Sequence, residues 1–113
     1  MFTRIGCASI KTTPRAIRNN YKLLMAAIEQ ARKEKIGILC TPELGLTGYG
    51  CEDAFFSEEF VERAWRYLCK IIPRTNCLGL VTIGLPIRFA GVNYNAVAVI
   101  FNGKLLGIVP KQH

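Results

Sequence analysis

The sequence lacks several residue patterns that metal sites, catalytic pairs and disulfide frameworks require. Its only histidine is His113, the last residue, which excludes a Cys/His metal site and a Ser/His catalytic pair. The five cysteines are odd in number and include no CxxC pair, which argues against a disulfide framework and against a zinc ribbon. We therefore expect no metal ion here, and we expect most of the cysteines to be buried thiols in a reducing compartment.

Long apolar runs and phosphate-binding loops are also missing. No apolar stretch reaches the about 20 residues that span a bilayer, and the first residues lack the apolar core and cleavage site of a signal peptide. Neither a GxxxxGK[ST] loop nor a GxGxxG loop after a strand is present. We predict a cytoplasmic protein with no membrane partner and with no cofactor in this domain.

Acidic residues are fewer than basic ones, 8 against 15, and the net charge is +7. A basic chain can bind nucleic acid, but these cations are dispersed and no aromatic platform or nucleic-acid motif accompanies them. Solvated helix faces explain the charge, so we expect no nucleic-acid partner.

The residues that are present indicate one α/β domain. Half of the 113 residues are apolar and 20% are charged, as in folded soluble domains. Helical spacing predicts a helix from the N-cap Thr13, with Pro14 at its first position, to near Lys35. A second helix should run from the N-cap Ser57 to Pro73, with Trp65 in its core-facing stripe. Apolar runs predict strands at 4–10, 36–39, 78–86, 93–101 and 104–109.

The order of these elements predicts their pairing. The strands at 4–10, which we expect to be buried, and at 36–39 flank a helix and should therefore be parallel. Asn102 and Gly103 separate the last two strands and form the strongest short hairpin signal. The last hairpin should expose an unpaired apolar edge that favours association.

Two predicted strands end in the same way, on a proline followed by a charged residue. "ILCTPE" ends on Glu43, and "GIVPK" ends on Lys111. Proline cannot donate to a β-ladder and marks strand ends, and ligands bind α/β sheets beyond the strand ends. If the two strands are neighbours, the carboxylate and the ammonium can meet.

Such a pair has more than one explanation. A buried carboxylate can act as a general base and a fixed ammonium can stabilise an oxyanion, which together suit acyl transfer once a nucleophile is supplied. A simple salt bridge, or two independent surface charges, accounts for the same pattern. Spacing alone leaves these alternatives open.

Other side chains near these motifs have plainer explanations. Cys51 is a poor nucleophile because its acidic neighbours, Glu52 and Asp53, disfavour the thiolate. Tyr94 and Asn95 alternate along a strand, where packing and a local hydrogen bond explain them.

Two stretches resemble the signatures of a known family. "PELGLTGYGCEDAF" (42–55) resembles the first signature of the nitrilase, or carbon–nitrogen hydrolase, superfamily, and its "GYGCEDAFF" part is similar to the glutaminase domain of glutamine-dependent NAD⁺ synthetases. "NYNAVAVIFNGKLLGIVPKQH" (93–113) resembles the second signature, which includes the catalytic lysine. The two motifs are specific in combination.

The resemblance implies a fold and a site. The fold would be a four-layer α-β-β-α sandwich, with residues 1–113 as its N-terminal portion. In a Cys–Glu–Lys triad, Glu43 would be the general base and Lys111 the oxyanion-stabilising lysine, and Tyr49 would lie near bound glutamine. The implied reaction is hydrolysis of the glutamine amide. Its ammonia would serve a second domain that uses ATP and Mg²⁺ to amidate nicotinic acid adenine dinucleotide.

The resemblance also implies that this chain holds only part of the site. The nucleophilic cysteine of the family lies downstream of the lysine, and none of the five cysteines matches its position. We expect a fragment without a nucleophile and without the synthetase domain. Its partners would be glutamine and, in the full-length protein, further copies of itself. A stand-alone nitrilase-type amidase acting on small linear amides and a catalytically inactive fragment remain alternatives.

Overall fold

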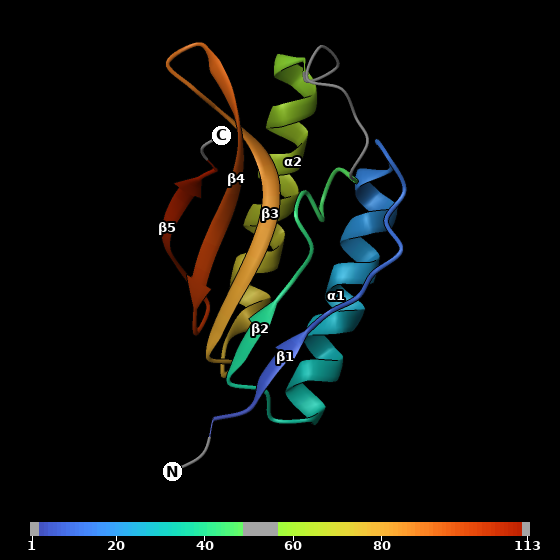
Figure 1. The fold of residues 1–113 in the computed structure, drawn as a ribbon, viewed down its shortest axis with the longest axis vertical. Coiled ribbons are helices and arrows are strands. Elements are labelled where there is room, and N and C mark those ends of the chain that lie inside the picture. The colour runs from blue at the N-terminus through green and yellow to red at the C-terminus, as the bar shows by residue number, and fades with distance from the viewer. Residues whose placement is uncertain (1–2, 49–56, 112–113) are drawn as a thin grey trace.

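The computed structural model describes residues 3–48 and 57–111. The described elements, in chain order, are β1 (Ile5–Cys7), α1 (Ile17–Lys33), β2 (Ile38–Cys40), α2 (Glu58–Ile71), the 3₁₀ helix η2 (Ile72–Thr75), β3 (Leu80–Phe89), β4 (Val92–Phe101) and β5 (Lys104–Pro110). They form a sheet of five strands in sequence order (Figure 1). The strands β1, β2 and β3 are parallel, whereas β4 and β5 are antiparallel to their neighbours. The predicted α/β class and the parallel first pair are confirmed.

Both helices cover one face of this sheet, and the described residues leave the other face uncovered (Figure 1). Alternate residues of the central strands are fully buried under the helices: Val81, Ile83 and Leu85 of β3, and Ala96, Ala98 and Ile100 of β4. All of these except Ala96 form one core with the apolar stripes of α1 and α2. The chain thus supplies one helix layer and one sheet layer, and the uncovered side is called the open face below.

The first helix begins later than predicted. It starts at Ile17, and its N-cap is Ala16, which makes no side-chain capping bond. The buried side chain of Asn20 explains the difference, because it accepts from Thr13 N and donates to Thr13 O, each at 2.8 Å. These tertiary bonds hold the predicted cap residue outside the helix. The second helix begins as predicted, with the hydroxyl of Ser57 accepting from Phe60 N at 3.2 Å.

Three burial predictions are wrong. The first strand is shorter than predicted, and it is exposed rather than buried. The Ile5 side chain is 67% exposed, because β1 is an edge strand and this side chain lies on the open face. Trp65 is 38% exposed, because it lies beside the buried stripe of α2. Of the described cysteines, Cys40 is half-buried and the other three are exposed. Cys7 lies on the edge strand, Cys69 on the surface of α2 and Cys77 in a turn.

The turns of the sheet are short. Asn102 and Gly103 both adopt positive φ angles, 48° and 81°, as the predicted hairpin requires. A second hairpin joins β3 to β4 through Ala90 and Gly91, at φ 51° and 77°. It was not predicted, because Ala-Gly is a weaker turn signal than Asn-Gly.

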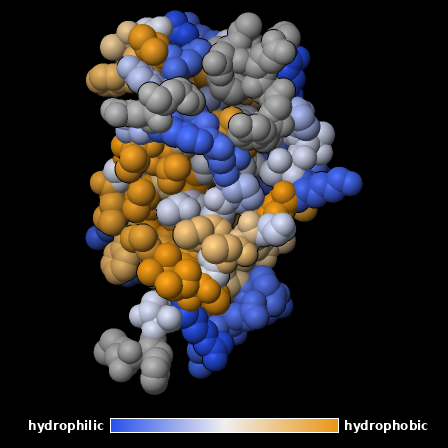
Figure 2. Space-filling view, viewed as in Figure 1, coloured by the Kyte–Doolittle hydropathy of each residue, from blue (hydrophilic) through white to orange (hydrophobic). Residues whose placement is uncertain are grey.

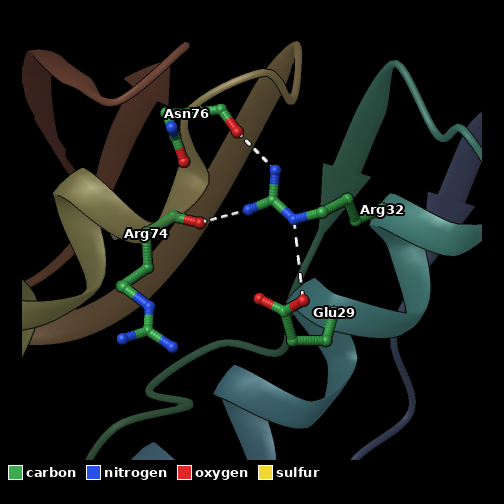
Figure 3. Close-up of polar contacts among 4 residues, drawn as sticks. All are labelled: Glu29, Arg32, Arg74 and Asn76. Carbon is green, nitrogen blue, oxygen red and sulfur yellow. Dashed lines mark hydrogen bonds and ion pairs between the residues drawn. The ribbon is translucent and has the colours of Figure 1, made fainter.

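Arg32 joins the end of α1 to η2. Its guanidinium donates to the backbone oxygens of Arg74 and Asn76, at 2.5 Å each, and its Nε lies 3.6 Å from a carboxylate oxygen of Glu29 (Figure 3). The side chain therefore fixes the helix layer against the loop that leads into β3. Within the described ranges, no helix has the length and apolar character needed to cross a membrane.

Candidate active site

Glu43 lies in a tight turn that follows β2. Gly45 N donates to Pro42 O at 3.1 Å, and Gly48 N donates to Leu44 O at 2.8 Å. Leu44, which is buried, has a φ of 51°, in a region that bulky side chains rarely occupy. Backbone strain of this kind persists only where surrounding contacts impose it, and it is frequent at functional sites.

Side chains and backbone groups from other elements hold this turn in place. Thr41 Oγ1 donates to Thr82 O on β3 at 2.5 Å, just before the turn. Leu46 N donates to Gly84 O at 3.2 Å, and Leu46 O accepts from the Asn20 side chain at 3.2 Å. The turn is therefore bonded on one side to the sheet and on the other to α1.

Gly84 of β3 lets the turn approach the sheet. A Cβ atom at this position would lie 2.5 Å from Leu44 N and 2.8 Å from Pro42 O, both of which are backbone atoms. Any larger residue would push the turn away from β3. The sequence signal was a single glycine inside an apolar strand, which is typical of a close backbone approach.

Lys111 reaches Glu43 from the edge strand β5. It directly follows β5, and its backbone N donates to Asn95 O on β4 at 2.7 Å. Its ammonium forms an ion pair with Glu43 Oε1. The charged residues of the two Pro-charge motifs, 68 positions apart, are thus in contact. The condition under which this contact was predicted is not met, because β3 and β4 separate β2 from β5 in the sheet.

Asn95 completes the cluster. Its side-chain Nδ2 donates to Glu43 Oε1 at 2.7 Å, the same oxygen that pairs with Lys111. It alternates with the buried Ala96 along β4 and therefore points to the open face. The interpretation of Asn95 as a packed residue with a local bond is wrong, because its partner lies 52 positions away. Asn95 lies within the stretch that resembles the second signature (93–113), but its spacing along a strand does not indicate which residue it contacts.

The ion pair is partly solvated. The side chain of Glu43 is 33% exposed and that of Lys111 is 51% exposed. Because the two charged groups are in contact, the alternative of two independent surface charges is wrong. A plain salt bridge fits this geometry as well as a catalytic pair does. Exposed pairs typically contribute only about 0–1 kcal/mol to stability, so the fold gains little from this one.

The remaining site predictions fall elsewhere. Tyr49 and Cys51 lie outside the described residues. Within the described part of the chain, no three His, Cys, Asp or Glu residues gather as metal ligands would. A hollow of about 950 Å³ lies between α2 and the β3–β4 hairpin. Most of its lining is apolar or aromatic, with the charged residues Glu58, Glu62 and Arg88 also on its wall. It lies on the helix side of the sheet, away from Glu43.

Comparison with known proteins identifies the family of this chain. Residues 4–113 match the model of the carbon-nitrogen hydrolase family, which is nearly the whole chain. The chain belongs to the carbon-nitrogen hydrolase family. The family prediction made from the two signatures is confirmed.

Relatives within this family include glutamine-dependent NAD⁺ synthetases. A putative synthetase of this name from Schizosaccharomyces pombe is 35% identical over 89 residues, which are 78% of this chain and 13% of the relative. The crystal structure of such a synthetase from Cytophaga hutchinsonii has a TM-score of 0.93 at 41% identity and covers 98% of this chain. The chain corresponds to 19% of that protein.

An amidase of the nitrilase superfamily shares the fold. The amidase from Nesterenkonia sp. AN1 has a TM-score of 0.83 at 22% identity, over 98% of this chain and 43% of its own. At this identity the likeness shows the fold alone. The sheet and the helix layer described above are therefore those of a nitrilase-type domain.

Proposed function

We propose that this chain supplies the general base and the oxyanion-stabilising lysine of a glutamine-hydrolysing site in a glutamine-dependent NAD⁺ synthetase. The observation that carries the proposal is the meeting of the two signature motifs at one oxygen. Glu43 Oε1 accepts hydrogen bonds from the ammonium of Lys111 and from the side-chain amide of Asn95 on the open face of the sheet. The relatives named as such synthetases support the choice of substrate.

Glu43 acts as the base in this proposal. A cysteine thiol, supplied by polypeptide beyond the residues of this sequence, gives its proton to the Glu43 carboxylate and attacks the amide carbon of glutamine. The proton then passes to the nitrogen, ammonia leaves, and a thioester remains. Water, deprotonated by Glu43, cleaves the thioester and releases glutamate. The half-exposed position of Glu43 leaves it reachable for these transfers.

Lys111 stabilises charge in both steps. Attack on the carbonyl places a negative charge on its oxygen, and a fixed ammonium nearby lowers the energy of that intermediate. Lys111 suits this role because its backbone is held to β4 and its ammonium already lies at the base. Tyr49 completes the proposed site as a residue that contacts bound glutamine.

The rest of the enzyme carries the remaining chemistry. ATP and Mg²⁺ would act in a synthetase domain that amidates nicotinic acid adenine dinucleotide with the released ammonia. The present sequence has no GxxxxGK[ST] loop, so we place no nucleotide on these residues. We further propose a cytoplasmic homo-oligomer as the full-length form.

Ammonia release from glutamine by the full-length polypeptide tests this function. We expect Glu43→Gln and Lys111→Met each to lower kcat at least about a hundredfold, because each removes a group that acts in the transition state. The exposed Glu59→Gln and Lys104→Met are the matched controls and should keep activity. Hydrolysis of small linear amides in place of glutamine would replace the proposal with a stand-alone amidase. Full activity in Glu43→Gln would refute the assigned base.

A further inference from the structure

We propose that Asn95 is a positioning residue that holds the base and the lysine of this site in one arrangement. Its effect on the reaction rests on the proposed function, whereas its effect on the position of Glu43 does not.

Asn95 contacts both members of the pair through different groups. Its side-chain Nδ2 donates to Glu43 Oε1 at 2.7 Å, and its backbone oxygen accepts from Lys111 N at 2.7 Å. The strand β4 that carries it pairs with β3 on one side and β5 on the other. One residue in the middle of the sheet thus connects the turn after β2 with the residue after β5.

The orientation of the Asn95 amide is determined by the carboxylate. Rotating it by half a turn would place its Oδ1 against Glu43 Oε1, and two acceptors would then face each other. In the observed orientation, Oδ1 is buried and has no hydrogen-bond partner among the described residues. A buried acceptor without a partner loses its bonds to water and gains none in return, so it destabilises the fold. Asn95 is therefore a poor choice for stability alone, which favours a role at the site.

Two donors on one oxygen restrict the base. A glutamate side chain has several rotatable bonds, and in a turn it would otherwise sample several positions. Asn95 Nδ2 and Lys111 Nζ both contact Oε1, so the carboxylate is held where the lysine also lies. Misplacing a catalytic group by about 1 Å can lower a rate about a hundredfold.

The kinetic test compares two asparagines of the same strand. Asn95→Val removes the amide and its unpaired oxygen, and valine suits a strand. We expect kcat for glutamine in the full-length enzyme to fall about ten- to a hundredfold, with KM within about threefold and an unchanged or higher Tm. The control is Asn93→Val, on the same face of β4, whose Oδ1 accepts from Arg88 at 3.4 Å. It should keep kcat within about twofold.

A spectroscopic test on the 113-residue chain is independent of activity. We expect the side-chain amide protons of Asn95 to exchange slowly with solvent by NMR, and Glu43→Ala to remove this protection while the β4 backbone amides keep theirs. If the full-length protein does not hydrolyse glutamine, the proposed function fails and this test still decides the role of Asn95. Unprotected Asn95 protons, or an Asn95→Val enzyme with normal kcat, would overturn the inference. A drop in kcat matched by an equal drop in Asn93→Val would also overturn it.

Discussion

Glu43 and Lys111 illustrate how a contact can matter little to the fold and still define a site. Their side chains remain 33% and 51% exposed, so water screens the charges. The backbone around them is held by further hydrogen bonds that do not depend on the ion pair. These bonds involve Thr41, Leu46 and Asn95. Such fixed surroundings suit a pair that must keep its geometry while a substrate reacts.

At the residue scale, we predict a small coupling energy between these two charges. A double-mutant cycle with Glu43→Gln and Lys111→Met should give about 0.2–1 kcal/mol, because solvent and salt screen an exposed pair. Urea unfolding of the four proteins measures it. A coupling above about 2 kcal/mol would show that the pair is mainly a structural salt bridge.

At the element scale, the turn after β2 depends on contacts with two neighbouring elements. Its bonds to β3 run through Thr82 and Gly84, and its bond to α1 runs through Asn20. Gly48 has a φ of 84° and lies close to the backbone of Thr13 and Pro14, where a Cβ atom would not fit. The position of Glu43 is therefore a property of the packed β2–α1–β3 unit rather than of the loop sequence.

We predict that Gly84→Ala is destabilising because the added methyl would meet the backbone of the turn. A Cβ atom there would lie 2.5 Å from Leu44 N. We expect a loss of about 1–3 kcal/mol in the free energy of unfolding, measured by urea titration.

The matched control for this substitution is Gly107→Ala on the edge strand β5. Apart from the neighbouring residues in the chain, no atom of the described residues lies within 4 Å of a Cβ placed there, so the free energy of unfolding should change little. Equal effects of the two substitutions would contradict the close approach as the cause.

At the scale of the whole molecule, the open face is the dominant surface feature. Large apolar side chains remain exposed there and along β5, with Phe101 at 50%, Leu106 at 62% and Val109 at 56%. Figure 2 shows apolar residues gathered over the region where Figure 1 places β4 and β5. The predicted apolar edge is confirmed, because β5 is the last strand of the sheet. Contiguous apolar surface of this kind favours association.

We predict that the 113-residue chain self-associates through this surface. Size-exclusion chromatography with light scattering should give a mass that rises with concentration, and the double variant Phe101→Lys and Leu106→Lys should remain closer to the monomer mass. Leu23→Lys, on the solvent side of α1 at 36% exposure, tests whether added charge alone has this effect. A wild-type chain that is monomeric at all concentrations would contradict the prediction.

The sequence by itself determined the class of the fold and the two ends of the site. Apolar periodicity is a local property, so both helices, the parallel first pair and the Asn102–Gly103 hairpin could be predicted. The two Pro-charge motifs identified Glu43 and Lys111 because in each a proline and a charged residue follow an apolar run.

Only the tertiary structure decided how these parts meet. Asn20 moved the start of α1 to Ile17, and Gly84 and Asn95 set the position of Glu43, through contacts between residues far apart in the chain. Such contacts depend on strand order and on which residues share a face of the sheet. A local pattern contains neither, which is why the role of Asn95 could be inferred only from the folded chain.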